Sequence, residues 1–173
     1  LEIGGGVIVG AIVAVNCFGD VVDPANGKIV AGSRSAEIGP LGIGAPGYFA
    51  DTQQVMTSLI GRTTIGFASR EHTVIGVVAT NARLNKAETN KMAQMAHDGM
   101  ARAIRPAHTM LDGDTIFALS TGKRRADINV VGAFAAEVTA QAILRAVRSA
   151  QPAAGLPGLA TSDPPATPEL DEE

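Results

Sequence analysis

Two carboxylates flank a glycine in the segment Asp112-Gly113-Asp114, which directly precedes a short apolar run. Asp and Gly are favoured in turns for local reasons, so the motif alone predicts a turn at the edge of a sheet. Two carboxylates placed together can also hold and orient a nearby nucleophile or amine. Both interpretations of Asp112 and Asp114 stay open on the residues alone.

Asn16 and Cys17 follow the apolar segment 7–15 (VIVGAIVAV). An amide at the end of a buried strand is an ordinary turn residue on spacing alone, but it can also donate a hydrogen bond to a developing oxyanion. Cys17 is a nucleophile by residue type, yet the sequence supplies no dedicated base for it. We therefore keep Asn16 as a candidate and give Cys17 no catalytic role.

Metal-binding residue types occur at His97, Asp98 and His108. His97 and Asp98 are adjacent, so on a helix their side chains point about 100° apart. This spacing matches none of the common ligand sets. A metal-dependent hydrolase using these three residues is therefore a minor alternative, and His97 is more simply a polar residue at a contact between a helix and a loop.

Thr73 directly precedes a second apolar segment, residues 74–80 (VIGVVAT). By composition it is only a β-branched residue at the start of a strand. Nothing in the local pattern marks it as a nucleophile.

Alternating strand and helix patterns must position these candidates. Periodicity predicts buried strands over 7–15, 74–80 and 115–119, with a long loop over 20–48 that holds a hairpin at Asn26-Gly27, and helices over 52–60, 85–104 and 129–150. The first strand is apolar on both faces, as expected between two layers. This order predicts an α/β fold.

The start and end of the helix over 85–104 have local signals. Asn85 and Glu88 form a capping-box pattern, and Pro106 stops the helix. The residues that share its apolar face are Met92, Ala96, Met100 and Ala103. We expect these methionines in the core.

Composition narrows the class of protein. The chain has 173 residues, 46% apolar and 18% charged, with a net charge of −3, which is enough apolar material for one core. Aromatics make up 3% of the residues and the pI is about 5.6, which argues against nucleic acid as a partner. The single cysteine excludes an internal disulfide and favours a reducing compartment, so we expect a cytoplasmic protein. No run reaches the roughly 18 uninterrupted apolar residues of a membrane span, so we expect no membrane partner.

The two ends of the chain differ from its body. Residues 151–173 hold five acidic residues, five prolines and no Lys or Arg, which predicts a flexible acidic tail or an arm that docks on a neighbouring subunit. Leu1 stands where an initiator methionine is expected, almost directly before a strand that is typical of mid-sheet. We therefore expect the chain to lack an N-terminal part of the fold.

Residues 72–122 (HTVIGVVATNARLNKAETNKMAQMAHDGMARAIRPAHTMLDGDTIFALSTG) resemble the L-aminopeptidase/D-esterase family of self-processing N-terminal-nucleophile hydrolases. The resemblance continues over residues 9–24 (VGAIVAVNCFGDVVDP) and more weakly over the last helix. The family also includes β-peptidyl aminopeptidases, a nylon-oligomer hydrolase and a pantetheine hydrolase. The individual motifs are common, but their order and spacing together are specific.

The resemblance implies a four-layer α/β/β/α sandwich and autocatalytic cleavage between His72 and Thr73. Thr73 would be the N-terminal nucleophile of the new chain. Residues 1–72 would be the C-terminal portion of the α-part, and residues 73–150 the core of the β-part, the two forming one domain.

The resemblance also assigns the remaining site residues. Asn16 matches an asparagine that stabilises the oxyanion, whereas Asp112 and Asp114 match paired positions that contact the nucleophile and support processing. The implied activity is hydrolysis of a small amide or peptide, as an aminopeptidase or a hydrolase of short linear amides, by a homo-oligomer of αβ units and without a metal or organic cofactor. His72 stands where relatives often have Asn or Gly, and the family's α-part is longer and carries a lysine near the active site. An unprocessed, non-catalytic member that serves as a structural or binding subunit is therefore the alternative.

Overall fold

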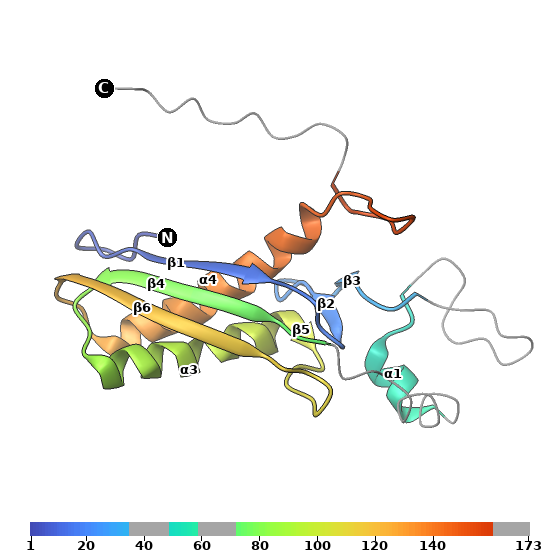
Figure 1. Cartoon of the computed structure of the whole chain (residues 1–173), viewed down its shortest axis with the longest axis horizontal. Helices are drawn as coiled ribbons and strands as arrows, with labels where there is room; N and C mark the ends of the chain where they lie inside the picture. The colour runs from blue at the N-terminus through green and yellow to red at the C-terminus, as the bar shows by residue number, and fades with distance from the viewer. Residues whose placement is uncertain (35–48, 59–71, 161–173) are drawn as a thin grey trace, which may run out of the picture.

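A three-stranded sheet in the order β1-β4-β6 is central to the computed structural model, which describes residues 1–34, 49–58 and 72–160 (Figure 1). β1 (Val9–Ala14) pairs antiparallel with β4 (Ile75–Ala82), and β4 pairs parallel with β6 (Thr115–Arg124). The three predicted strands are confirmed. β6 runs five residues beyond its predicted end because those residues are exposed and polar on the edge of the sheet, where periodicity gives no apolar signal.

Two long helices cover one face of this sheet (Figure 1). α3 (Lys86–Ala103) connects β4 to β6, and α4 (Ile128–Arg148) follows β6. The core lies between the sheet and the two helices, and it includes the predicted apolar face of α3. Its residues are Val9, Val78, Met92, Ala96, Met100, Ala103, Val131, Ala135 and Ile143. The predicted core positions of α3 are therefore confirmed.

The capping box predicted at the start of α3 is present. The Glu88 amide donates to Asn85 Oδ1 at 2.9 Å, and the Asn85 amide donates to Glu88 Oε2 at 2.8 Å. These two bonds satisfy backbone donors that the first helical turn leaves unpaired. The helix ends at Ala103, and Ile104 begins the short strand β5 (Ile104–Arg105).

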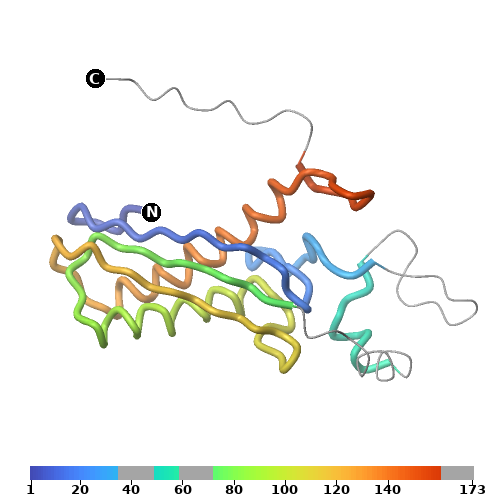
Figure 2. The backbone as a smooth tube through the Cα atoms, viewed as in Figure 1, coloured from blue at the N-terminus to red at the C-terminus, as the bar shows by residue number. Residues whose placement is uncertain are grey.

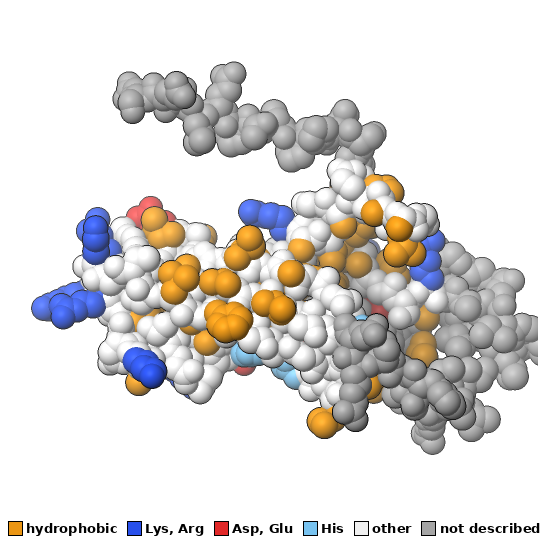
Figure 3. Space-filling view, viewed as in Figure 1, with side chains coloured by type: hydrophobic (Ala, Val, Ile, Leu, Met, Phe, Trp, Pro, Cys, Tyr) orange, Lys and Arg blue, Asp and Glu red, His pale blue; other side chains and the backbone are white. Residues whose placement is uncertain are grey.

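The opposite face of the sheet is uncovered in the described part of the chain. Ile12 is 74% exposed and Phe117 60% exposed, and Ile8, Ile75 and Leu119 are exposed beside them. Figure 3 shows hydrophobic side chains spread over this face. The described residues therefore cover only one of the two faces on which layers were expected, and the expectation for the other face stays a prediction. Composition showed that both faces are apolar, but it carries no information on which layer covers each.

A second, smaller sheet has the order β3-β2-β5 and lies near the end of β1. β2 (Asp20–Val22) and β3 (Ile29–Ala31) form the predicted hairpin, and Gly27 in its turn has φ 69°, a left-handed conformation that glycine adopts without strain. The prediction of a loop from residue 20 onward is wrong here, because β2 is a fully buried strand. Residues 35–48 of that segment lie outside the described residues.

Asp20 joins this sheet to α1 (Thr52–Thr57). Its carboxylate has no solvent exposure and accepts hydrogen bonds from the Thr52 amide at 2.6 Å, the Thr52 hydroxyl at 2.8 Å and the Ser33 amide at 3.3 Å. A buried carboxylate is tolerated only when it is bonded in this way. The predicted helix at 52–60 is confirmed as far as Thr57, and residues 59–60 lie outside the described part.

Among the described helices, α4 alone is long and apolar enough to cross a membrane by length and composition. Nine of its residues are nevertheless buried, including Val131, Ala135 and Ile143, against the sheet and α3. This is the packing of a core helix. The described part of the acidic tail, residues 151–160, contains a tight turn in which Ala153 and Leu156 exchange hydrogen bonds, and residues 161–173 lie outside the described part.

The two helices approach closely at Gly99. A Cβ at this position would collide with the Ala136 carbonyl oxygen and lie 2.8 Å from Thr139 Cβ. We expect Gly99→Ala to lower the free energy of unfolding by about 1–3 kcal/mol through overpacking, although Gly→Ala usually stabilises a helix by about 0.5–1 kcal/mol. Urea unfolding followed by circular dichroism measures the change.

Ala101→Ser is the matched control, since it adds one heavy atom at an exposed position of the same helix. Its effect on the free energy of unfolding should stay within about 0.5 kcal/mol. A Gly99→Ala protein that is more stable than the wild type would contradict the close approach of α3 and α4.

Candidate active site

Thr73 lies where the end of β1 meets the start of β4. The antiparallel register pairs Ala14 with Ile75, so the residues just beyond each strand also come together. The Thr73 amide donates to the Asn16 carbonyl oxygen at 2.7 Å. The structure thus brings Asn16 and Thr73 together, at the end of the sheet that lies on the right in Figure 2.

The carbonyl group of His72 accepts two hydrogen bonds. The Gly113 amide donates to it at 2.9 Å, and the Thr73 hydroxyl donates to it at 2.7 Å. The parallel pairing of Ile75 with Thr115 produces this contact, because the residues before both strands then lie side by side. A backbone amide at this carbonyl is the kind of donor that stabilises an oxyanion.

Sequence reasoning missed Gly113 as a site residue. A Cβ at this position would lie 2.8 Å from the Thr73 hydroxyl oxygen, so any side chain would crowd that oxygen. Gly113 therefore serves two purposes, since its amide binds the His72 carbonyl and its missing side chain leaves room for the Thr73 hydroxyl. The only signal in the sequence was its place between the two candidate aspartates.

Asp112 ties two loops together. Its Oδ1 accepts from the Phe18 amide at 3.1 Å, and its Oδ2 accepts from the Thr109 amide at 3.0 Å and the Thr109 hydroxyl at 2.7 Å. Phe18 is two residues after Asn16. Asp112 therefore fixes the backbone that carries Asn16.

Asp114 holds the residue after Thr73. Its side chain is 5% exposed, its Oδ1 accepts from the Val74 amide at 3.1 Å, and its Oδ2 lies 2.8 Å from His108 Nδ1. The structure thus gathers all four predicted site residues at one end of the sheet. The two carboxylates bind backbone amides next to Asn16 and Thr73.

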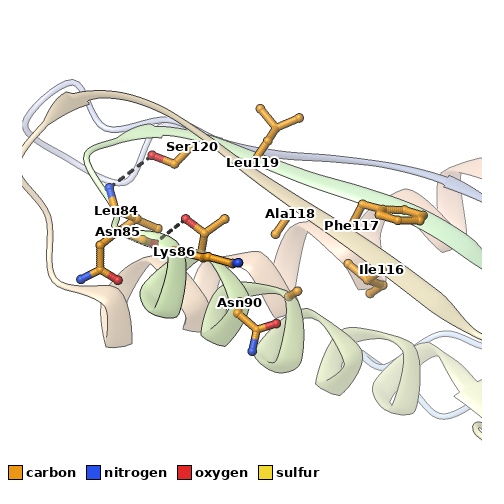
Figure 4. Close-up of a pocket in the computed structure, with 11 residues that line it drawn as sticks. Leu84, Asn85, Lys86, Asn90, Ile116, Phe117, Ala118, Leu119 and Ser120 are labelled. Atoms are coloured by element: carbon orange, nitrogen blue, oxygen red, sulfur yellow. Dashed lines mark hydrogen bonds between the residues drawn. The ribbon is translucent and has the colours of Figure 1, made fainter.

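A hollow of about 390 Å³ borders this arrangement. It is lined by residues after β1, by β2, by the end of β3 and by His72, including Asn16, Cys17, Phe18, Gly32 and Ser33. The His72 ring contacts the Phe18 ring edge to face, with centroids 5.5 Å apart. A larger pocket of about 460 Å³ lies along β6 and the start of α3, and none of the predicted site residues lines it (Figure 4).

The residues of the metal alternative lie partly together. The His97 and His108 rings meet edge to face with centroids 4.9 Å apart, and the pKa of His97 is lowered, mainly by burial and then by the nearby His108. Within residues 1–34, 49–58 and 72–160, no three His, Cys, Asp or Glu side chains gather in an arrangement that could hold a metal ion.

Cys17 lines the hollow, but its thiol is held protonated. Burial raises its pKa from an ordinary value of 9.0 to about 11, with smaller contributions from the Asp112, Asp114 and Asp20 carboxylates, and Sγ donates to the Gly19 carbonyl at 3.0 Å. At pH 8 the thiolate fraction is then about a hundredfold lower than at the ordinary pKa. We expect native Cys17 to react with iodoacetamide about a hundredfold more slowly than the same thiol in urea, as followed by intact mass. Equal rates in both states would contradict this environment.

Comparison with known proteins places this chain in a family. The profile of peptidase family S58 matches residues 1–161. A protein of Mycobacterium tuberculosis named as an uncharacterized aminopeptidase is 39% identical over 168 residues, which cover 88% of this chain and 47% of the relative. A protein of Mycobacterium leprae with the same description is 41% identical over 167 residues, covering 88% of this chain and 43% of the relative.

A 6-aminohexanoate-oligomer endohydrolase of Paenarthrobacter ureafaciens is 32% identical over 149 residues, covering 79% of this chain and 39% of the relative. The chain thus spans just under half the length of the two mycobacterial relatives. The family match over most of the chain confirms the resemblance of residues 72–122. The chain belongs to peptidase family S58, the L-aminopeptidase/D-esterase family.

Proposed function

We propose that this chain is part of a self-processing amide hydrolase in which Thr73 cleaves the bond that precedes it. The observation that carries the proposal is the 2.7 Å hydrogen bond from the Thr73 hydroxyl to the His72 carbonyl, which is also bound by the Gly113 amide. A nucleophile and an oxyanion donor therefore meet at one peptide group. Cleavage would divide the chain into a part that ends at His72 and a part that begins at Thr73.

Processing would proceed by an N-to-O acyl shift. Thr73 Oγ1 adds to the carbonyl carbon of His72, and the oxygen that gains negative charge is stabilised by the Gly113 amide and by the Asn16 side chain. The C–N bond then breaks, and the leaving nitrogen takes up the proton that the Thr73 hydroxyl released on attack, so that it becomes the Thr73 α-amine. Water hydrolyses the resulting ester, which leaves a carboxylate on His72 and restores the Thr73 hydroxyl.

Cleavage also creates the base that the hydroxyl lacks. A free α-amine has an ordinary pKa of about 7.7–8.0, so it is partly neutral near neutral pH and can take the proton of its own residue's hydroxyl. An external amide bound in the hollow beside Asn16 would then acylate Thr73 and lose its amine, and water would release the acid. Asp112 and Asp114 hold the backbone on which Asn16 and Thr73 depend. No step uses a metal or an organic cofactor.

The names of the relatives narrow the substrate class. They comprise aminopeptidases and a hydrolase of 6-aminohexanoate oligomers, whose scissile groups are all secondary amides. We accordingly assign short peptides or linear amides to this chain, with residues 1–72 as the end of an α-part and residues 73–150 as the core of a β-part. The organisation as a homo-oligomer of αβ units rests on the family resemblance.

The uncovered face of the sheet supports a four-layer α/β/β/α sandwich. Ile12, Phe117 and other large apolar residues of β1, β4 and β6 are exposed, and hydrophobic side chains are spread over this face of the molecule (Figure 3). Apolar surface of this extent is stable in water only when another layer covers it. A second sheet with its own helices would provide that layer.

Thr73→Ala tests the nucleophile in the full-length protein. We expect the wild type to yield a fragment that begins Thr-Val-Ile-Gly by denaturing intact mass and N-terminal sequencing, and the variant to stay in one piece. Thr73→Ser keeps a hydroxyl at the same atom and should still be cleaved. An uncleaved wild-type protein without amidase activity would contradict the proposal and favour a non-catalytic subunit.

Gly113→Ala and Asn16→Ala test the oxyanion donors. Alanine at 113 would push against the Thr73 hydroxyl and displace the Gly113 amide, whereas alanine at 16 removes an amide donor. Loss of one such donor costs about 10²–10³-fold in rate. We expect each variant to slow cleavage by at least about a hundredfold in a time course by gel and mass.

Ala101→Ser is the control for Gly113→Ala, because it also adds one heavy atom but at an exposed position of α3. It should be cleaved at the wild-type rate. Cleavage of Gly113→Ala as fast as that of the control would remove Gly113 from the site.

A further inference from the structure

A chain of polar contacts leads from helix α3 to the residue after Thr73. His97 on α3 meets His108 edge to face, His108 Nδ1 lies 2.8 Å from Asp114 Oδ2, and Asp114 Oδ1 accepts from the Val74 amide. The proposed cleavage uses Asp114 but assigns no role to either histidine. The two rings lie between the site and solvent, since the His108 side chain is 37% exposed and that of Asp114 is 5% exposed.

The orientation of the Asp114 carboxylate depends on both of its bonds. One oxygen binds the Val74 amide, so the plane of the carboxylate is set by what binds the other oxygen, and His108 supplies that bond. Nδ1 must carry a proton to donate to a carboxylate. A donor of this kind fixes the acceptor more firmly than a mobile water would, because its own position is fixed by the backbone.

The backbone of His108 is held in an uncommon conformation. Its φ is 57°, in the left-handed region that few residues other than glycine adopt, with Asn, Asp and His the most frequent among them. Such outliers cost free energy and persist where the surroundings over-determine them, often at functional sites. Here the conformation directs the ring at Asp114.

His97 supports the ring of His108 from the other side. Burial, and then the neighbouring His108, lower the pKa of His97, whereas the carboxylates of Asp114 and Asp98 act in the opposite direction. His97 is thereby favoured in its neutral form, which avoids charge repulsion between the rings. The His108 ring is thus packed on one side and bonded to a carboxylate on the other.

We infer that His108 is a positioning residue that holds the Asp114 carboxylate on the Val74 amide, and that it thereby sets the position of Thr73 for cleavage. The effect on cleavage rests on the function proposed above. The effect on the Val74 amide is independent of that function, so the state of the amide and the rate of cleavage are measured separately.

Two substitutions separate the hydrogen bond from the backbone conformation. His108→Gly removes the donor and adopts a positive φ without strain, whereas His108→Asn keeps an N–H near the position of Nδ1 and also tolerates this φ. Arg148→Ala is the control, because it breaks another ion pair, the 2.7 Å contact with Asp23, in which neither His108 nor Asp114 takes part. Asp114→Asn serves as the reference, because it shows how the Val74 amide responds when the Asp114 carboxylate is replaced.

The first measurement is the Val74 amide by NMR, in full-length protein that carries Thr73→Ala so that all samples remain uncleaved. We expect His108→Gly to shift this resonance in the same direction as Asp114→Asn and to speed its hydrogen exchange about tenfold or more. His108→Asn and Arg148→Ala should leave the resonance and the exchange rate of this amide close to those of the Thr73→Ala protein. An unchanged Val74 amide in His108→Gly, or an equal change in His108→Asn, would overturn the inference.

The second measurement is the cleavage rate with Thr73 in place. We expect His108→Gly to slow cleavage by about tenfold to a hundredfold, and His108→Asn to restore most of the rate. Wild-type cleavage rates in His108→Gly would overturn the effect on Thr73. A wild type that is never cleaved would contradict the proposed function, whereas the NMR measurement on the Val74 amide would still test whether His108 positions Asp114.

Discussion

The site depends on one peptide group that is held from two directions. The N–H of Thr73 binds the Asn16 carbonyl, and the carbonyl of His72 binds the Gly113 amide. These anchors come from the ends of two different strands, β1 and β6, on either side of β4. Both bonds exist only because β1 is antiparallel to β4 while β6 is parallel to it, so the topology of the sheet is itself part of the site.

The segment Asp112-Gly113-Asp114 before β6 holds this peptide group and its neighbours in place. Its two carboxylates bind backbone amides, Asp112 at Phe18 and Asp114 at Val74, so each stiffens one of the segments that carry Asn16 and Thr73. Gly113 between them supplies its amide and leaves space for a hydroxyl. The three residues 112–114 thus fix two neighbouring segments and provide one oxyanion donor, so a short motif can support chemistry without contributing a nucleophile of its own.

The remainder of the fold keeps these strand ends in place. α3 and α4 pack closely at Gly99 and cover one face of the sheet, and the buried Asp20 attaches β3 and α1 to β2 beside the hollow. The other face carries an exposed apolar surface that includes Ile12 and Phe117. The parts of the structure that bind one another tightly therefore surround the site, whereas the exposed face is the surface on which the proposed second sheet would pack.

Local interactions were readable from the sequence. The capping box at Asn85, the buried face of α3 around Met92 and the three strands depend on residues within a few positions of each other, so spacing alone determined them. Asn16, Asp112 and Asp114 were candidates by residue type and position. The nomination of Thr73 required the resemblance of a longer segment to a family, because no local pattern distinguishes a nucleophilic threonine from one that starts a strand.

Only the tertiary structure decided which of these residues meet. The contacts of Gly113 with His72 and of Asp20 with Thr52 join residues that are 41 and 32 positions apart. The contact of His108 with Asp114 lies across a turn whose shape the sequence does not predict. Each depends on strand register and loop conformation, which residue type does not encode at that range. For the same physical reason, the sequence showed that the sheet is apolar on both faces, and the structure alone showed which face the helices cover.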